Sequence, residues 1–186
     1  MPHANITKRI LADSLKQLMA KEAFSKICVS DIVENCGFTR QAFYYHFKDK
    51  YDLMNWIYYT ETASFMSNYD MANHWTDGLK DLCYYMQENK SFYINALNTT
   101  GQNSFQEYLY GYLRDIAMSV IESKGRSFEE KWEFTAEFMA TTIVGLLVHW
   151  ANDGMEEDPA KYIAHIRSIF DGSMLHELEG KENHES

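Results

Sequence analysis

The sequence predicts an all-α protein made of a three-helix helix-turn-helix head and a larger helical body. Only 9 glycines and 2 prolines occur among 186 residues, so the chain has few of the turn signals that an all-β fold needs. Apolar residues recur three and four positions apart over long stretches, which indicates amphipathic helices. We therefore expect a head over residues 1–50, a body over residues 51–175 and a disordered polar tail over residues 176–186.

The head should begin with a one-sided amphipathic helix from about Asn5 to Ala23. Ser30 is suited to cap a second helix, because its hydroxyl can accept a hydrogen bond from a free helix N–H group. Gly37 follows that helix at the position where a left-handed backbone favours glycine. Thr39 can then cap a third, short helix, so the head is expected to contain three helices joined by tight turns.

The third helix should have a buried side and an exposed side. Phe43 and Phe47 lie four residues apart, share one face and are expected in the core of the head. The outward-facing residues are expected to be Arg40, Gln41, Tyr44, Tyr45 and His46. A helix, a glycine turn and a second helix with a polar and aromatic outer face form the helix-turn-helix arrangement of DNA-binding proteins. The segment 39–47 is therefore the part expected to contact DNA.

Polar and glycine-containing breaks divide the body into further helices. Asp49 can cap a fourth helix, which should reach the low seventies. Asp158 followed by Pro159 marks another helix start, with aspartate as the cap and proline at the first helical position. The helices expected after the fourth lie near residues 75–89, 91–98, 104–123, 128–153 and 159–174.

The net charge of −10 is divided unevenly between the two parts. Residues 1–50 carry eight Lys or Arg and five Asp or Glu, a net charge of +3, whereas residues 51–186 carry nine and twenty-two, a net charge of −13. A mildly basic head on an acidic body suits a protein that contacts phosphate groups with one end only.

Three segments of the head resemble the TetR family of bacterial transcription regulators: Val29–Val33, Cys36–Arg40 and Phe43–Leu53. The most specific part is the string Tyr-Tyr-His-Phe-Lys-x-Lys-x-x-Leu after a Gly-x-Thr turn, and the resemblance covers residues 6–57. Two body segments, residues 88–93 and 145–150, resemble a subgroup of the same family that includes regulators of dihydroxyacetone kinase operons.

The resemblance implies a homodimer in which each subunit supplies one DNA-binding head and one effector-binding and dimerisation body. The last two long helices of each body would pair into a four-helix interface. The expected function is that of a sequence-specific transcriptional regulator, a ligand-responsive repressor of an inverted-repeat operator. The alternative is a regulator, including an activator, that a protein partner controls in place of a small molecule.

The resemblance also assigns contacts to double-stranded DNA. Thr39, Arg40, Gln41 and Ala42 would enter the major groove at the start of the third helix. Arg40 suits guanine O6 and N7, Gln41 suits adenine N6 and N7, and Ala42 can meet a thymine methyl group. The residues expected at phosphate groups are Ser30, Tyr44, Tyr45, His46 and Lys50.

The body offers weaker candidates, because large apolar side chains are as common in any helical core as in a ligand pocket. The pocket candidates are Trp75, Tyr108, Tyr112, Phe138 and His149. The acidic charge of the body favours a cationic or neutral ligand over an anion. The candidates for the dimer interface are Thr142, Gly145, Leu146, Ile163, Ile166 and Phe170, which combine small residues with surplus apolar surface.

Other functions find no support in the residue patterns. The seven histidines lack metal-ligand spacing, so we expect no metal ion. No nucleophile elbow, glycine-rich phosphate loop or H-E-x-x-H motif occurs, so we expect neither an enzyme nor a cofactor. No run of about 18 apolar residues occurs, and residues 1–5 lack the apolar core of a signal peptide, so a cytoplasmic protein without a membrane span is expected.

Overall fold

The computed structural model describes residues 2–67, 71–101, 104–125 and 130–171, and the predicted tail lies outside them. The described residues form nine α-helices and one 3₁₀ helix, with no strand among them, which confirms the predicted all-α class. The head contains α1 (Pro2–Met19), η1 (Phe24–Lys26), α2 (Val29–Cys36) and α3 (Arg40–His46). The body contains α4 (Lys50–Ser67), α5 (Met71–Glu88), α6 (Lys90–Asn98), α7 (Phe105–Ser123), α8 (Glu130–Asn152) and α9 (Pro159–Phe170).

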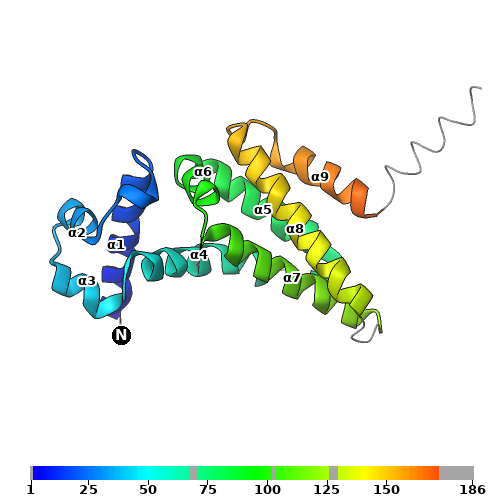
Figure 1. Cartoon of the computed structure of the whole chain (residues 1–186), viewed down its shortest axis with the longest axis horizontal. Helices are drawn as coiled ribbons and strands as arrows, with labels where there is room; N and C mark the ends of the chain where they lie inside the picture. The colour runs from blue at the N-terminus through cyan, green and yellow to red at the C-terminus, as the bar shows by residue number, and fades with distance from the viewer. Residues whose placement is uncertain (1, 68–70, 102–103, 126–129, 172–186) are drawn as a thin grey trace, which may run out of the picture.

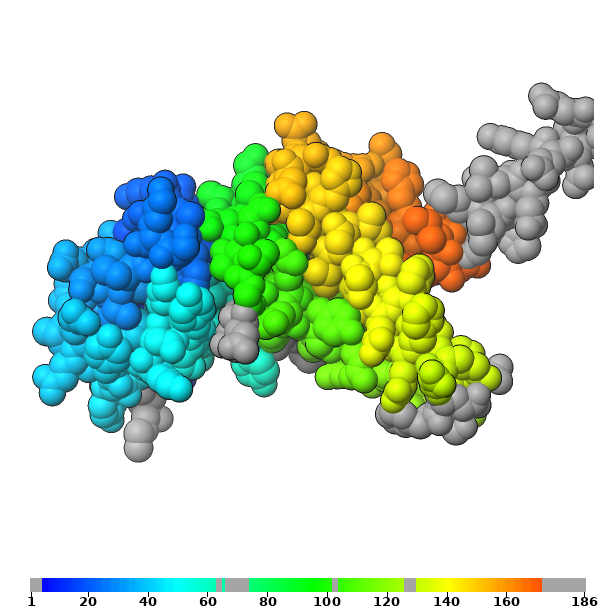
Figure 2. All heavy atoms as spheres, in the orientation of Figure 1, coloured from blue at the N-terminus to red at the C-terminus, as the bar shows by residue number. Residues whose placement is uncertain are grey.

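The molecule is elongated, with the head at one end (Figure 1). Helix α4 leads from the head into the body, where α7 and α8 run side by side and α9 packs against α5. The head meets the body along α1, which contacts both α4 and α6. Figure 2 shows the blue and cyan head against the green segment of the body, with the far end of the body well removed from it.

The core of the head forms where α1, α2 and α3 meet. Leu11 and Leu15 of α1 and Ile32 of α2 are fully buried, as expected for the apolar stripes of amphipathic helices. Ser14 is also buried, and its hydroxyl donates to the carbonyl of Ile32 at 2.7 Å. Asn35 Nδ2 donates to Ser14 Oγ at 3.0 Å, so a satisfied polar pair joins α1 to α2 at the edge of the apolar core.

Helix α2 starts earlier than predicted. Cys28 is its N-cap, and the Asp31 carboxylate accepts a 2.7 Å hydrogen bond from the Cys28 N–H. Hydrogen bonds from Cys28 lower the pKa of Asp31 below its ordinary value. The prediction of Ser30 as the cap was wrong because a carboxylate three residues after the cap can satisfy the free N–H group instead. Ser30 therefore lies in the first turn of α2.

The other predicted helix signals are confirmed. Gly37 has φ 73°, the left-handed conformation expected after α2. Thr39 Oγ1 accepts from the Ala42 N–H at 3.1 Å and caps α3. Asp49 Oδ1 accepts from two N–H groups at the start of α4, and Asp158 Oδ1 accepts from the Lys161 N–H at the start of α9.

The body core is built around α8. Ala140, Leu147 and Trp150 are buried on one side of this helix, which packs against α6 and α7. An 18-residue stretch of α8 has a mean hydropathy of 1.3, which by length and composition alone is enough to cross a membrane. The central helix of a globular domain has the same composition, and 39% of this stretch is buried inside the molecule.

Candidate nucleic-acid interface and body cavity

Helix α3 buries one side and presents the other to solvent. Phe43 is completely buried and Phe47 is 3% exposed, so their predicted place in the core is confirmed. Tyr44 and Tyr45 are 50% and 83% exposed. The two adjacent tyrosines therefore present phenol groups to solvent on α3, which lies in the head at one end of the molecule (Figure 1).

Arg40 connects the two helices of the helix-turn-helix unit at its exposed side. Its Nη1 donates to Ser30 Oγ over 3.4 Å, and a hydrogen bond with Tyr44 raises the pKa of Arg40. Ser30 belongs to the first turn of α2 and Tyr44 to α3. The three side chains therefore form one polar cluster that holds a permanent positive charge, the type of surface that binds phosphate and guanine.

The remaining predicted contacts surround this cluster. Thr39 and Gln41 are exposed, and Ala42 is half-buried. The ring of Tyr45 lies edge-on to the ring of His46, with 4.9 Å between centroids and 86° between planes. The structure thus brings these residues onto one surface of the head, and their contact with DNA stays a prediction.

Lys50 does not belong to this surface. Its Nζ donates to the backbone carbonyls of Phe24 at 2.9 Å, Ser25 at 3.3 Å and Ile27 at 2.7 Å, which uses all three of its N–H donors. Its ammonium also lies 4.5 Å from the centroid of the Phe24 ring, and burial lowers the pKa of Lys50. The predicted phosphate contact is therefore corrected: Lys50 fastens the start of α4 to the segment between α1 and α2.

A partly buried ion pair joins the head to the body. Lys16 Nζ of α1 lies 2.8 Å and 3.0 Å from the two carboxylate oxygens of Glu61 in α4. Tyr93 of α6 donates its hydroxyl to Glu61 Oε2 at 2.9 Å. Burial, followed by the nearby Glu61 charge, raises the pKa of Tyr93, so the phenol stays a neutral donor.

Asn95 of α6 makes a second connection to the head. Its Nδ2 donates to the carbonyls of Met19 at 2.9 Å and Glu22 at 2.7 Å, and its Oδ1 accepts from the Phe24 N–H at 3.3 Å. These backbone groups lie at the C-terminal end of α1 and in the turn after it, where helix carbonyls lack partners within the helix. The Asn95 side chain of the body thus satisfies these backbone groups, as a C-terminal cap would do.

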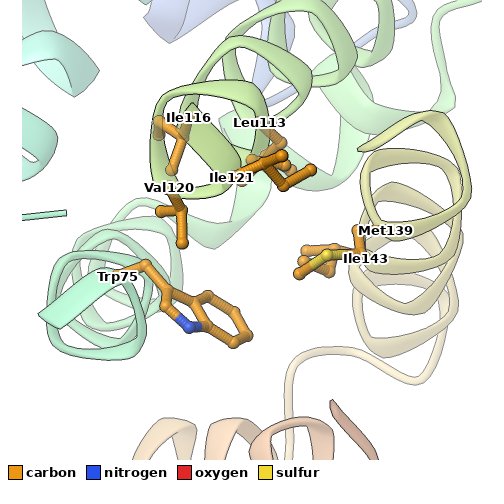
Figure 3. Close-up of a pocket in the computed structure, with 8 residues that line it drawn as sticks. Trp75, Leu113, Ile116, Val120, Ile121, Met139 and Ile143 are labelled. Atoms are coloured by element: carbon orange, nitrogen blue, oxygen red, sulfur yellow. The ribbon is translucent and has the colours of Figure 1, made fainter. Parts of the chain in front are cut away.

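The body contains a cavity with a volume of about 80 Å³ between α5, α7 and α8. Its wall includes Trp75 of α5, Leu113, Ile116 and Ile121 of α7, and Met139 and Ile143 of α8. Figure 3 shows Trp75 facing Met139 and Ile143 across this space. Trp75 was predicted as a pocket residue, whereas the aliphatic residues of the wall were not singled out because they look like ordinary core in the sequence.

The four other pocket candidates do not line this cavity. Phe138 is 56% exposed, and His149 is an exposed residue whose Nε2 lies 3.5 Å from Asp153 Oδ2, so neither lies in the interior. Tyr108 instead links α7 to α4, because its hydroxyl accepts from Thr62 Oγ1 at 3.1 Å. The Tyr112 ring stacks on Tyr108 with 6.3 Å between centroids.

Two of the predicted interface residues also lie elsewhere. Ile163 and Ile166 are 3% and 2% exposed within a single chain, because that side of α9 packs against α5. They are core residues and not interface residues. Phe170 is half-buried and meets Trp75 edge-on, with 6.0 Å between centroids.

Helix α8 keeps an uncovered apolar side. Phe134 and Phe138 are 69% and 56% exposed, and Gly145 is exposed further along the same helix. A Cβ added to Gly145 would meet nothing within 4 Å, so packing within one chain does not require glycine there. Thr142 and Leu146 are half-buried at the edge of this side. Phe134 was not among the predicted interface residues, although its four-residue spacing from Phe138 is visible in the sequence.

No group of three His, Cys, Asp or Glu residues in the described ranges could hold a metal ion. Cys83 is fully buried, and burial raises the pKa of its thiol, so it remains protonated. Cys28 and Cys36 are free thiols in the head.

A three-helix unit with an exposed polar and aromatic third helix, carried on a larger helical body, defines a helix-turn-helix DNA-binding regulator. A sequence comparison with protein-family models gives two matches. The family described as bacterial regulatory proteins, tetR family, matches residues 11–56, and the family described as transcriptional regulator C-terminal region matches residues 73–172. The chain belongs to the TetR family of bacterial transcriptional regulators. Regulators of this family bind DNA operators and act as dimers.

The chain is similar to the HTH-type dhaKLM operon transcriptional activator DhaS of Lactococcus lactis subsp. lactis (strain IL1403), with 33% identity over 93 residues. That match spans 50% of this chain and 50% of the relative. A solved structure of a dihydroxyacetone kinase operon activator DhaS has a TM-score of 0.67 at 23% identity, and covers 90% of this chain and 96% of its own.

Two further solved structures share the fold. The fatty acid degradation regulator FadR from Bacillus halodurans has a TM-score of 0.65 at 15% identity, with coverage of 88% of this chain and 93% of its own. NalD, the secondary repressor of the MexAB-OprM multidrug efflux pump in Pseudomonas aeruginosa, has a TM-score of 0.60 at 16% identity, with coverage of 92% and 98%. The fold therefore occurs in activators and repressors alike.

Proposed function

We propose that this regulator binds an inverted-repeat operator as a homodimer in the cytoplasm and represses nearby genes until a small molecule enters the body cavity. The observation that carries the proposal is that two polar connections, Lys16 with Glu61 and Asn95 with the end of α1, join the head to the body that holds the cavity. The protein has no enzymatic activity of its own in this proposal, because its output is the occupancy of DNA.

The proposed DNA contacts divide between bases and phosphates. Arg40 forms a bidentate pair with guanine, Gln41 pairs with adenine, and Ala42 contacts a thymine methyl group. Thr39 lies in the major groove beside them, whereas the hydroxyl of Ser30 and the aromatic side chains of α3 hold the phosphate backbone. The phosphate-contacting residues of α3 are Tyr44, Tyr45 and His46.

Signal transfer between the two parts runs through α7 and α4 in this proposal. Leu113 and Ile116 line the cavity on α7, and Tyr108 of the same helix is hydrogen-bonded to Thr62 of α4. Glu61, which precedes Thr62 in α4, forms an ion pair with Lys16 of α1. A ligand that displaces α7 therefore moves α4 and, through it, the head. Changing the spacing of the two heads of a dimer weakens operator binding.

The uncovered side of α8 is the proposed dimer interface. Exposed Phe134 and Phe138 supply apolar surface, and Gly145 lets a partner helix approach closely at a position where glycine otherwise weakens a helix by about 1 kcal/mol. A self-complementary patch of this kind is buried by a two-fold axis. Phe138→Glu should shift the protein to monomer in sedimentation, whereas Tyr59→Glu, at an aromatic residue of α4 that is 68% exposed, should leave the dimer intact.

The direct test of ligand control measures operator binding by fluorescence anisotropy with and without candidate ligands. A ligand that occupies the cavity should raise the melting temperature, because it binds the native state. It should also release the operator. A ligand that raises the melting temperature and leaves DNA binding unchanged would contradict ligand control of DNA binding.

A second candidate function is activation of a dihydroxyacetone kinase operon under the control of a protein partner. The observation that favours it is the similarity to DhaS, which is named as an activator of such an operon. The two candidates predict opposite effects of a gene deletion on transcription of the regulated operon. Removing the gene should raise transcription of the regulated operon if the protein represses it and lower transcription if the protein activates it.

A further inference from the structure

The cavity between α5, α7 and α8 has an unusual wall for a small-molecule site. Its lining side chains are aliphatic apart from the thioether of Met139 and the indole of Trp75. None of them carries a charge, a hydroxyl or an amide. Most pockets include a few placed polar groups that orient a ligand, so this wall restricts which ligands can bind.

The chemistry of the wall selects against polar molecules. A hydroxyl, carbonyl or carboxylate that enters the cavity gives up its hydrogen bonds to water, and the indole N–H of Trp75 is the one polar side-chain group in the wall. An apolar molecule has no hydrogen bonds to water to lose, and it gains dispersion contacts with the isoleucines and with the face of Trp75. The cavity therefore favours uncharged ligands without hydrogen-bonding groups.

The size of the cavity sets a second limit. Its volume of about 80 Å³ is several times that of one water molecule and about half that of the engineered protein cavity of roughly 150 Å³ that binds benzene. One aromatic ring, or an aliphatic group of similar size, is therefore the upper limit, and it fits only if the wall moves outward. Met139 can supply that adjustment, because methionine side chains adapt readily to different shapes.

Trp75 is placed to report or transmit such an adjustment. It follows His74, where α5 departs from helical geometry with φ −130° and ψ 24°. Its ring also meets Phe170 at the end of α9. An occupant that presses on Trp75 thus acts at a break in α5 and at the last turn of α9 together.

We propose that this cavity binds small uncharged apolar molecules, up to one aromatic ring in size, and rejects polyols, small sugars and carboxylates, including dihydroxyacetone. The effect of such a ligand on DNA rests on the proposed function above, whereas the binding itself does not.

The test titrates the full-length protein with benzene and follows the Ile δ1-methyl signals by NMR. Ile116, Ile121 and Ile143 line the cavity and should shift in a saturable way, whereas Ile6, an exposed residue of α1 in the head, should not. Dihydroxyacetone and benzoate at the same concentrations should leave all four signals in place. Saturable shifts of the three cavity signals with either polar compound, or none with benzene, would overturn the proposal.

Two variants make the result independent of any single substitution. Ala117→Ile fills the cavity from α7 and should abolish the benzene shifts at Ile116 and Ile143. Met139→Ala enlarges the cavity and should admit naphthalene, which the unaltered protein excludes. Benzene shifts that persist unchanged in both variants would show that the compound binds elsewhere.

A parallel measurement of operator binding separates this inference from the proposed function. Benzene that saturates the cavity signals and leaves the operator bound supports the ligand class and contradicts ligand control. An operator that is released by a polar effector, with the cavity signals unmoved by benzene, contradicts the ligand class and leaves ligand control in place.

Discussion

Replacing Asn95 with alanine should loosen the head from the body at a single point. The side chain makes two short hydrogen bonds, of 2.9 Å and 2.7 Å, to the carbonyls of Met19 and Glu22, and a longer one of 3.3 Å to the Phe24 N–H. A hydrogen bond contributes about 1 kcal/mol net. The two short bonds then amount to about 2 kcal/mol, with little added by the third.

The assay compares Asn95→Ala with Asn98→Ala at one protein concentration. Among the described residues, the Asn98 amide donates only to the Ile94 carbonyl of its own helix, at 2.9 Å, so its loss should cost less than about 0.5 kcal/mol. For a chain of this size, about 2 kcal/mol corresponds to a fall in melting temperature of roughly 4–8 °C. Operator affinity should fall with Asn95→Ala only. Equal effects of the two substitutions would refute a specific role for the contact between α6 and the head.

Three further substitutions test the head. Arg40→Ala should relax the preference at one base pair, at a cost of about 1–3 kcal/mol, which a binding-selection assay would detect. Lys50→Met should lower the unfolding free energy in urea by about 1–3 kcal/mol without changing the salt dependence of DNA binding, because its charge lies on carbonyls and not on phosphate. Because the pKa of Asp31 is lowered in the folded state, its stabilising effect should be present at neutral pH and lost as the pH falls below the ordinary range of an aspartate. Asp31→Asn should remove that part of the acid sensitivity in melting curves.

The head could be predicted from the sequence because its determinants are local. A glycine at a required left-handed position, a threonine cap and two phenylalanines four residues apart fix α3 and its exposed side without knowledge of the body. Lys50 is different, because its carbonyl partners lie more than twenty residues away in the chain. A lysine next to a DNA-contacting motif looks the same in the sequence whether it binds phosphate or its own backbone.

The body was harder to predict because its helices have two apolar sides. Ile163 and Ile166 were expected at the interface and Phe138 in a pocket, yet the isoleucines form core and the phenylalanine lies on the surface. Helical periodicity shows which residues share a side, but only the packing of α5 against α9 decides which side is buried. The residues of the cavity wall could not be predicted for a related reason, since aliphatic residues around a void have the same sequence pattern as aliphatic residues around a filled core.

The most direct test of the account selects operator sequences from random double-stranded DNA with the full-length dimer and follows with footprinting. We expect an inverted repeat whose half-sites are about one helical turn, or a multiple of it, apart, each protected in the major groove. We also expect Tyr45→Ala to weaken binding to all selected sequences alike. Enrichment of a single unrepeated site bound by a monomer, or no enrichment at all, would contradict the claim that α3 contacts DNA as one half of a dimer.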